Sequence, residues 1–287
     1  MDDEGKISSL QGTSVDEDNE TANVSVPAVE RALDILELLA EGHARDKRLT
    51  QAQIGRHLGL PKGTAHRLLA TLKTRGYIER IGGESGRERG GYTLGARLIT
   101  LAAQARGQMD VVQAAESPMR QLARETGEGC QLSVRVQGQA VCVARVPSPS
   151  HPEVTLMGGI GSSFPLHAVA VGKALLAGAS ENEQEAYAEQ YMVAFTPRTL
   201  TTRNSLLAEL TRIRETGLAC DEQEYKRGLR ALAAPVFDAA GAVCAALALP
   251  LLVGDETDLA AETSFETALR EAAAVISHEL GYRKAQK

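Results

Sequence analysis

The chain has 287 residues and a mass of 30.5 kDa, which is long for one domain and favours two domains with a short tail. Hydrophobic residues make up 43% of the sequence, but no apolar run approaches the about 18 residues that would span a bilayer, so we expect no membrane span. The net charge of −6 would argue against a nucleic-acid partner if it were spread evenly along the chain. However, residues 27–106 hold 14 basic and eight acidic residues, so this segment is basic and could bind nucleic acid.

The first 25 residues and the segment after them differ in pattern. Residues 1–25 are acidic and polar, without apolar periodicity, which predicts a disordered tail. They lack the basic start and apolar middle of a secretory signal, so we expect a cytoplasmic protein. From Pro27 onward, apolar residues at helical spacing predict a first core helix that ends near Gly42. These residues are Val29, Leu33, Leu36 and Ala40.

Residues 49–80 predict two helices joined by a tight turn. Thr50 suits the N-cap of the first helix, and Gly59 can adopt the left-handed conformation that ends it. Pro61 suits the start of the second helix, where its missing N–H is not needed. The apolar stripe of the second helix consists of Ala65, Leu68, Leu69 and Leu72. Its opposite face carries the short or donor-rich side chains that a helix needs to approach base edges in a major groove.

A hairpin and a further helix follow. The segment YIERIG predicts a strand, GESGRERGG a turn-rich tip with Arg87 and Arg89, and YTL the returning strand. Residues 26–94 therefore predict a winged helix-turn-helix. A helical stretch at residues 95–109 is expected to link it to the rest of the chain.

Residues 110–287 predict an α+β domain with a mainly antiparallel sheet. Helices are expected at about 111–126, 168–178, 181–191, 203–216 and 264–282. Strands are expected in CQLSVRV, AVCVARV, VTLM, LRALAAPVF and AVCAALAL. The cysteines at positions 130, 142, 220 and 244 lie far apart, with no histidine at ligand spacing. We interpret them as buried thiols and expect no metal site.

Three stretches of the sequence occur together in a specific order. They are VPAVERALDILELLA with LTQAQIGRHLGLPKGTAHRLLATLKTRGYIER, then FPLHAVAVGKALLA at 164–177, and TGLACDEQEYKRGLRALAAPVFDAAGAVCAALAL at 216–249. With these stretches the chain resembles the IclR family of bacterial transcription regulators over about residues 26–284. The resemblance implies an N-terminal winged helix-turn-helix, a linker helix that helps dimerisation, and a GAF-like effector-binding domain at residues 110–287. It also implies a homodimer or homotetramer that represses or activates at palindromic DNA operators without a cofactor.

The resemblance places the exposed face of residues 62–74 in the major groove of double-stranded DNA. The expected contacts from this helix are Lys62, Gly63, Thr64, His66 and Arg67, joined by Thr50 and Gln51 at the start of the preceding helix. Arg87 and Arg89 are expected to contact phosphates or the minor groove, since a wing adds affinity without direct base readout. The alternative for each of these side chains is ordinary solvation on an exposed face.

The resemblance also implies an effector site. Ala170 and Val171, at a helix start, would offer backbone N–H groups to a carboxylate. The other expected contacts are Leu156, Phe164, Asp221, Leu229, Ala231, Ala248 and Pro250. Family members that bind small oxo-acids have hydroxyl or thiol side chains where this chain has Ala231, Ala248 and Pro250. An organic acid with an aromatic or branched apolar body is therefore the expected effector; the alternative is that these residues only pack a core.

The sequence disfavours two other classes of function. An enzyme is disfavoured because Gly172-Lys173 lacks the Ser or Thr and the first Gly of a phosphate loop, and no nucleophile elbow or zinc motif is present. We interpret His167 as a core histidine bonded to backbone. A protein-interaction module is disfavoured by the basic charge of residues 27–106, and the absence of affinity for random duplex DNA at low salt would favour it.

Overall fold

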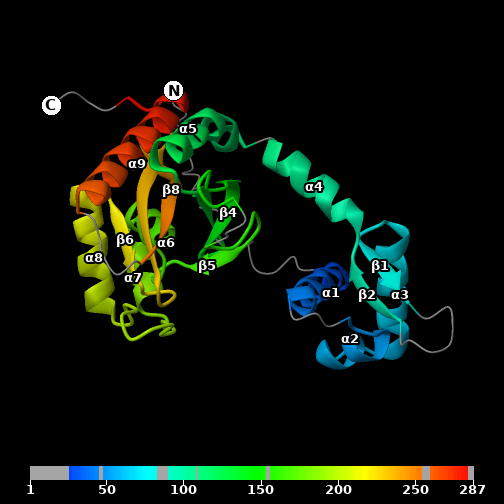
Figure 1. The fold of residues 1–287 in the computed structure, drawn as a ribbon. Helices are drawn as coiled ribbons and strands as arrows, with labels where there is room; N and C mark the ends of the chain where they lie inside the picture. The colour runs from blue at the N-terminus through cyan, green and yellow to red at the C-terminus, as the bar shows by residue number, and fades with distance from the viewer. Residues whose placement is uncertain are drawn as a thin grey trace, which may run out of the picture. The chain divides into compact units, whose positions relative to one another are not determined.

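A computed structural model describes residues 26–44, 48–82, 90–107, 109–152, 156–253 and 259–283. The described chain forms two compact units, which divide between Ala103 and Gln104 (Figure 1). The acidic segment 1–25 and the wing tip with Arg87 and Arg89 lie outside the described residues. Each unit is considered by itself below.

The first unit is a three-helix arrangement with a two-stranded hairpin. Its elements are α1 (Pro27–Ala44), α2 (Gln51–His57), α3 (Lys62–Thr74), β1 (Ile78–Ile81), β2 (Gly91–Leu94) and the start of α4 (Ala96–Gly107). The strands pair antiparallel, from Ile78 opposite Leu94 to Ile81 opposite Gly91. Because the hairpin follows α3 directly, this unit has the order of a winged helix.

The core of the first unit corrects the expected packing of α1. Ile35 and Leu39 are buried, together with Ile54 of α2 and Leu69 of α3. By contrast, Val29 and Leu33 are 56% and 53% exposed, and Ala40 is exposed as well. Both stripes have helical spacing, so periodicity alone could not choose between them. Packing against α2 and α3 selects the face that carries Ile35.

The second unit contains a sheet with helices on both faces. Its helices are α5 (Asp110–Thr126), α6 (Ala170–Ala177), α7 (Glu181–Ala188), α8 (Arg203–Thr216) and α9 (Leu259–Glu279). Its strands are β3 (Cys130–Val136), β4 (Gln139–Val146), β5 (Ser163–Pro165), β6 (Ala219–Glu222), β7 (Leu229–Phe237) and β8 (Val243–Leu252). The strand order is β5-β4-β3-β8-β7-β6, with every pairing antiparallel. This is the expected α+β class.

The strands differ from the expectation at three places. The segment VTLM was expected to form a strand, but Leu156 and Met157 lie in a bend, and residues 153–155 are outside the described part. Conversely, β5 and β6 were not expected, and both lie at the edges of the sheet. They contain three and four residues, which is too short for an alternating pattern to stand out in a sequence.

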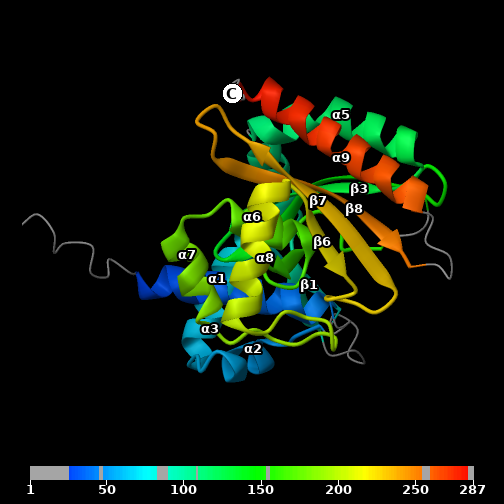
Figure 2. The same ribbon diagram turned by 90° about the vertical axis from the view of Figure 1, so that its left-hand side faces the viewer.

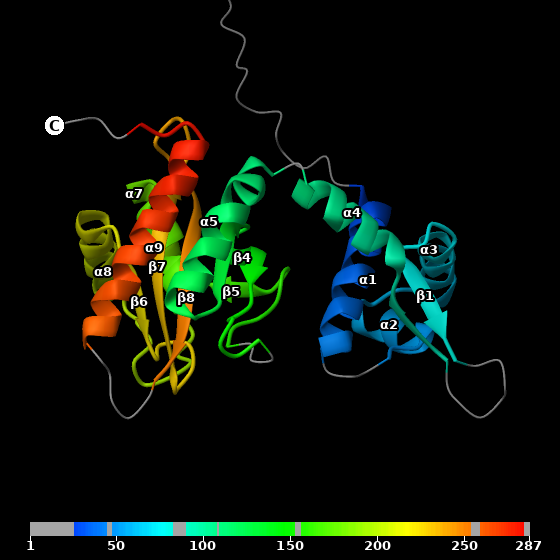
Figure 3. The same ribbon diagram turned by 45° about the horizontal axis from the view of Figure 1, so that its top comes forward.

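Alternation along the strands separates two apolar cores. Helices α5 and α9 lie side by side on one face of the sheet, and α6 and α8 lie on the other (Figures 2 and 3). Leu132, Leu232 and Leu247 point toward α5 and α9, whereas Ala231, Ala233 and Ala248 belong to the core that contains α6. The small side chains of β7 and β8 let α6 lie close to the sheet.

Helix α6 also lies close to the chain that precedes it. A Cβ atom built on Gly172 would come within 2.6 Å of the backbone of Leu166. Glycine is therefore required at this position to fold the segment back against its own helix. This contact fixes the place where α6 begins, and every residue of α6 is buried.

Candidate functional site

The junction of α2 and α3 is built from local chemistry. Thr50 caps α2: its hydroxyl accepts the Gln53 N–H at 3.4 Å, and Gln53 Oε1 accepts the Thr50 N–H at 2.8 Å. Gly59 then takes a φ of +61°, and the Leu60 N–H donates to the Gly55 carbonyl oxygen at 2.8 Å. Pro61 is the N-cap of α3, with no side-chain hydrogen bond. The turn between the two helices is thus short and well defined.

Helix α3 presents a polar face opposite its buried stripe. Ala65, Leu69 and Leu72 are buried, and Leu68 is partly buried against the same core. On the other side Lys62, Gly63, His66 and Arg67 are exposed and Thr64 is half-buried. A Cβ atom on Gly63 would meet no atom within 4 Å, so packing within the chain does not require glycine there. The small residue leaves space for a partner to approach the helix.

The two residues at the start of α2 are already engaged within the protein. The Thr50 hydroxyl donates to Gln53 Oε1 at 2.8 Å in addition to capping the helix. The Gln51 side-chain amide donates to the Lys62 carbonyl oxygen at 3.3 Å, which ties the starts of α2 and α3 together. Both residues are half-buried. Any contact they make with DNA would come in addition to these roles.

The expected effector residues lie together in the core between α6 and the sheet. Phe164, Ala170, Val171, Leu229, Ala231 and Ala248 belong to one apolar cluster, and Leu156 packs against it. Asp221 lies opposite Ala231, which lies opposite Pro250, so these three residues share a sheet face with Leu229. The start of α6 has Val169 as its N-cap and no side-chain cap, which leaves its first N–H groups as donors inside a buried region.

Asp221 is the charged member of this set. It is fully buried, and its Oδ1 accepts the N–H groups of Glu224 and Tyr225 at 2.6 and 3.4 Å. Within the described residues, its Oδ2 has no hydrogen-bond partner. Burial raises the pKa of this carboxyl group to about 6, and the nearby Glu224 acts in the same direction. The site therefore offers donors at α6 and one unsatisfied acceptor at β6.

Sequence reasoning missed buried polar residues on the same sheet face. Gln131 and Ser133 of β3 lie opposite Ala248 and Ala246, and both are at most 2% exposed. Ser133 Oγ has no partner among the described residues. Their alternation with Cys130, Leu132 and Val134 could have revealed them, since they are the only polar residues among the five buried positions of this strand, 130–134.

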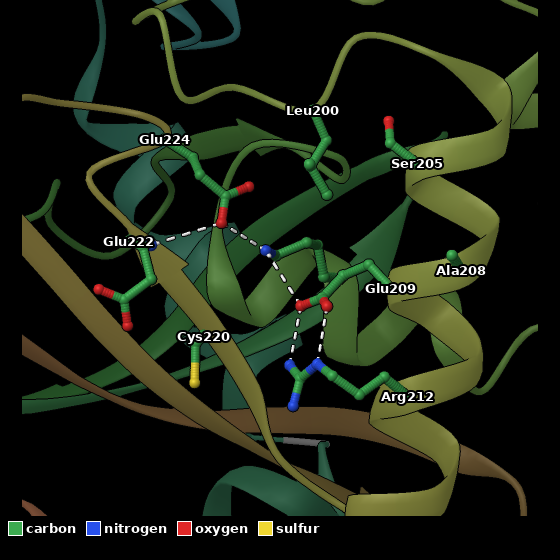
Figure 4. A pocket seen from close by; sticks show the side chains of 9 residues that line it. Leu200, Ser205, Ala208, Glu209, Arg212, Cys220, Glu222 and Glu224 are labelled. Atoms are coloured by element: carbon green, nitrogen blue, oxygen red, sulfur yellow. Dashed lines mark hydrogen bonds and ion pairs between the residues drawn. The ribbon is translucent and has the colours of Figure 1, made fainter.

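Lys173 of α6 was also missed. It is 1% exposed, and its Nζ lies 2.6 Å from Glu224 Oε1 and 3.3 Å from Glu209 Oε1 (Figure 4). The sequence did contain a sign of this ion pair, because a single lysine stands inside the apolar run AVAVGKALLA. A lysine that is buried with such a run needs an acidic partner. The partners lie far away in the sequence, so the run could not reveal them.

Histidine and cysteine residues have structural roles in this unit. His167 is buried, with Nε2 3.0 Å from the Val193 carbonyl oxygen and Nδ1 3.0 Å from the Tyr187 hydroxyl, which confirms it as a core histidine. Burial lowers the pKa of its imidazole. The four cysteines are present as thiols. Cys130 and Cys142 are buried as expected, but Cys220 and Cys244 are only half-buried.

The described residues contain no group of three or more histidine, cysteine or acidic side chains that could hold a metal ion. None of their helices combines the length and the apolar character needed to cross a membrane.

The first unit is a winged helix. The second unit has an antiparallel sheet, a buried acidic residue and a helix start that offers N–H donors. This combination defines a DNA-binding regulator with a ligand-sensing domain. Family models agree with this class. The model of the IclR helix-turn-helix domain matches residues 28–82, and that of the bacterial transcriptional regulator IclR C-terminal domain matches residues 103–278. The chain belongs to the IclR family of transcription regulators.

Individual relatives extend along nearly the whole chain. The HTH-type transcriptional regulator XynR of Escherichia coli is 35% identical over 260 residues, which is 90% of this chain and 98% of the relative. The regulator KdgR of the same organism is 32% identical over 262 residues, covering 90% and 94%. These relatives are regulators and not enzymes.

Solved structures show the same fold. An IclR transcriptional regulator from Alicyclobacillus acidocaldarius has a TM-score of 0.76 and 27% identity, covering 90% of this chain and all of its own. An IclR homolog from Microbacterium hydrocarbonoxydans, solved in complex with 4-hydroxybenzoate, has a TM-score of 0.72 and 26% identity, covering 88% and 98%. The two-domain arrangement of elements is therefore shared with known regulators.

Proposed function

We propose that this regulator represses or activates genes at a palindromic operator, and that a small organic acid bound in the second unit controls its affinity for DNA. The observation that carries the DNA-binding part is the exposed face of α3, whose direction is set by the buried stripe on the opposite side. Its place of action is the cytoplasm, where a bacterial chromosome lies.

The proposed DNA contacts come from three segments of the chain. Arg67, His66, Thr64 and Lys62 would reach base edges and phosphates of the major groove, and Gly63 would let the backbone approach. Thr50 and Gln51 would reach the phosphate backbone from the start of α2. Arg87 and Arg89 would add phosphate contacts from the wing. The basic excess of residues 27–106 supports this assignment.

Arg67→Ala tests the placement of α3. Loss of a guanidinium that contacts a guanine or a phosphate should weaken operator binding by about tenfold or more. The operator is first selected from a random DNA pool, and affinity is then measured by fluorescence anisotropy. Arg120→Ala, on the exposed side of α5 in the other unit, is the matched control and should bind like the parent. Parental affinity of the Arg67 variant would show that α3 is placed wrongly.

A homodimer or homotetramer is the proposed assembly. Exposed apolar side chains on α1 and α4 support it: Val29 and Leu33 are more than half exposed, and Ile99 is 74% exposed. Two recognition helices related by a twofold axis would match a palindrome, because each half-site receives one helix.

The proposed effector carries both a carboxylate and a hydrogen-bond donor. The carboxylate would accept from the N–H groups of Ala170 and Val171, and a hydroxyl group would donate to the unsatisfied Oδ2 of Asp221. Leu156, Phe164 and Leu229 with Ala231, Ala248 and Pro250 would surround an aromatic or branched body. The 4-hydroxybenzoate bound by the Microbacterium homolog has these three features.

A matched series of benzoates tests this effector class. We expect 4-hydroxybenzoate to raise the melting temperature of the protein and to change its affinity for the operator. Benzoate and 4-methoxybenzoate should bind at least about tenfold more weakly, because neither can donate a hydrogen bond to Asp221. Equal binding of all three compounds would refute the role of Asp221. Stabilisation by short oxo-acids alone would refute the aromatic or branched class.

A further inference from the structure

A cavity lies beside the free edge of the sheet, between α8 and β6. Its volume is about 490 Å³, within the range of sites for small molecules. Lys173 of α6 lines it. Glu209 and Arg212 project from α8, and Cys220 and Glu224 come from the chain of β6 and the turn after it (Figure 4). None of the proposed effector contacts lines this cavity, so it is a separate place in the second unit.

The charges that line the inner part of the cavity cancel one another. Lys173 pairs with Glu224 at 2.6 Å and with Glu209 at 3.3 Å. Arg212 holds Glu209 through two hydrogen bonds, each of 2.8 Å. Two cations therefore face two carboxylates, and Glu222 at the rim is paired with Arg230 at 2.6 Å. This balance favours neither an anion nor a cation as the occupant.

One acceptor in this network is not satisfied. Glu224 Oε1 accepts from Lys173 and from the Glu222 N–H, but Oε2 has no partner in the part of the chain that the structure describes. The side chain is 7% exposed, so it is largely cut off from bulk solvent. An unpaired carboxylate oxygen in such a place is costly and calls for a donor.

The edge of β6 adds backbone groups to the same cavity. In an antiparallel pair, alternate residues direct their N–H and C=O groups away from the neighbouring strand. Glu222 is such a residue, since its N–H donates to Glu224 rather than to β7. Cys220, two positions earlier, has the same direction, and β6 is an edge strand of the sheet that the described residues form. The cavity therefore presents a backbone donor and a backbone acceptor close to a carboxylate oxygen.

We propose that this cavity binds a small neutral polyhydroxy compound, a polyol or a sugar. Each hydroxyl group can both donate and accept, so one molecule satisfies Glu224 Oε2, the Cys220 C=O and the Cys220 N–H together. Leu200 and Ala208 supply apolar wall for the C–H groups of such a ligand. This site does not depend on the proposed effector or on DNA binding.

Titration of the full-length protein with xylitol and with glucose tests the proposal. Binding is followed by the amide chemical shifts of Cys220 and Glu222, because polyols also stabilise proteins without binding, and that effect does not saturate. We expect a saturable shift in the millimolar range for at least one of the two compounds. Glu224→Gln, which removes the charge but keeps the shape, should weaken it by about tenfold or more.

A second variant keeps the test independent of the ion pairs. Ala208→Leu places bulk at the mouth of the cavity from an exposed position of α8 and should also abolish the saturable shift. Ala186→Leu makes the same change at an exposed position of α7 and should leave it intact. Shifts that stay linear with concentration, or binding that both Glu224→Gln and Ala208→Leu leave unchanged, would overturn the proposal. Saturable binding of propylamine or acetate in place of the polyols would also overturn it.

Discussion

Asp221 shows how burial decides the chemistry of a single residue. The carboxyl group is fully buried, its Oδ1 is held by two backbone N–H groups, and its Oδ2 is unsatisfied. Desolvation outweighs the hydrogen bonds, so the pKa rises from 3.8 to about 6. A group whose ionised form is disfavoured in the folded state makes stability depend on pH.

Asp221→Asn should stabilise the protein at neutral pH. In the parent protein, the contribution of protonated Asp221 to the free energy of unfolding is fully present below pH 3.8. This contribution is lost as the pH rises through about 6. The asparagine variant avoids this loss, so its free energy of unfolding should exceed that of the parent by up to about 3 kcal/mol at pH 8. The difference should shrink steadily from pH 6 to pH 4. Urea unfolding at several pH values measures it.

The control for this prediction is Asp34→Asn, which removes an exposed carboxylate of α1. Its effect on stability should be small, because the side chain lies on the exposed surface of the helix. A difference between Asp221→Asn and the parent that stays constant with pH would contradict the assignment of a raised pKa to Asp221.

At the scale of single elements, α2 depends on its ends. It has seven residues, too few for a helix that is stable by itself in water. Only Ile54 of this helix is fully buried. The capping box of Thr50 and Gln53 and the left-handed Gly59 must therefore supply much of what holds α2 in place. The position of α3 follows, because the turn between the helices is short.

Thr50→Ala should destabilise the first unit by about 1 kcal/mol, because the Gln53 N–H loses its acceptor. Thr50→Ser keeps the hydroxyl and should unfold like the parent. Thermal unfolding of both variants, followed by circular dichroism, gives the comparison. If the alanine variant were as stable as the parent while binding operator DNA more weakly, Thr50 would act on DNA alone and not as a cap.

At the scale of the whole molecule, charge is divided along the chain. Residues 1–26 hold one lysine against seven acidic residues, whereas residues 27–106 have an excess of six basic residues. A net charge of −6 thus hides a basic DNA-binding unit. The acidic segment is covalently joined to this unit and repels the phosphates that the unit must approach.

Removal of residues 1–25 should strengthen binding to random duplex DNA several-fold at about 50 mM salt. The effect should fade by about 0.5 M salt, because it acts through space between charges rather than through a fixed contact. Fluorescence anisotropy across a salt series measures it. A gain in affinity that is the same at every salt concentration would instead indicate that the segment blocks the DNA-binding surface sterically.

The sequence by itself determined the features that arise from neighbouring residues. Thr50, Gly59 and Pro61 each have a local conformational preference, so the helix-turn-helix could be predicted from them. The exposed face of α3 followed from the apolar stripe on its opposite side. The same holds for α8, whose predicted range of 203–216 is confirmed. The three family stretches predicted the IclR family, which the comparisons confirm.

Only the tertiary structure decided what depends on residues far apart in the chain. It selected Ile35 rather than Leu33 as the core residue of α1, because two helical stripes of similar apolar character were available. It created β5 and β6, whose few residues form strands only because longer neighbours pair with them. It also placed Glu224 beside Lys173 across 51 positions of sequence. Burial and long-range pairing are properties of the folded chain, and no local pattern encodes them.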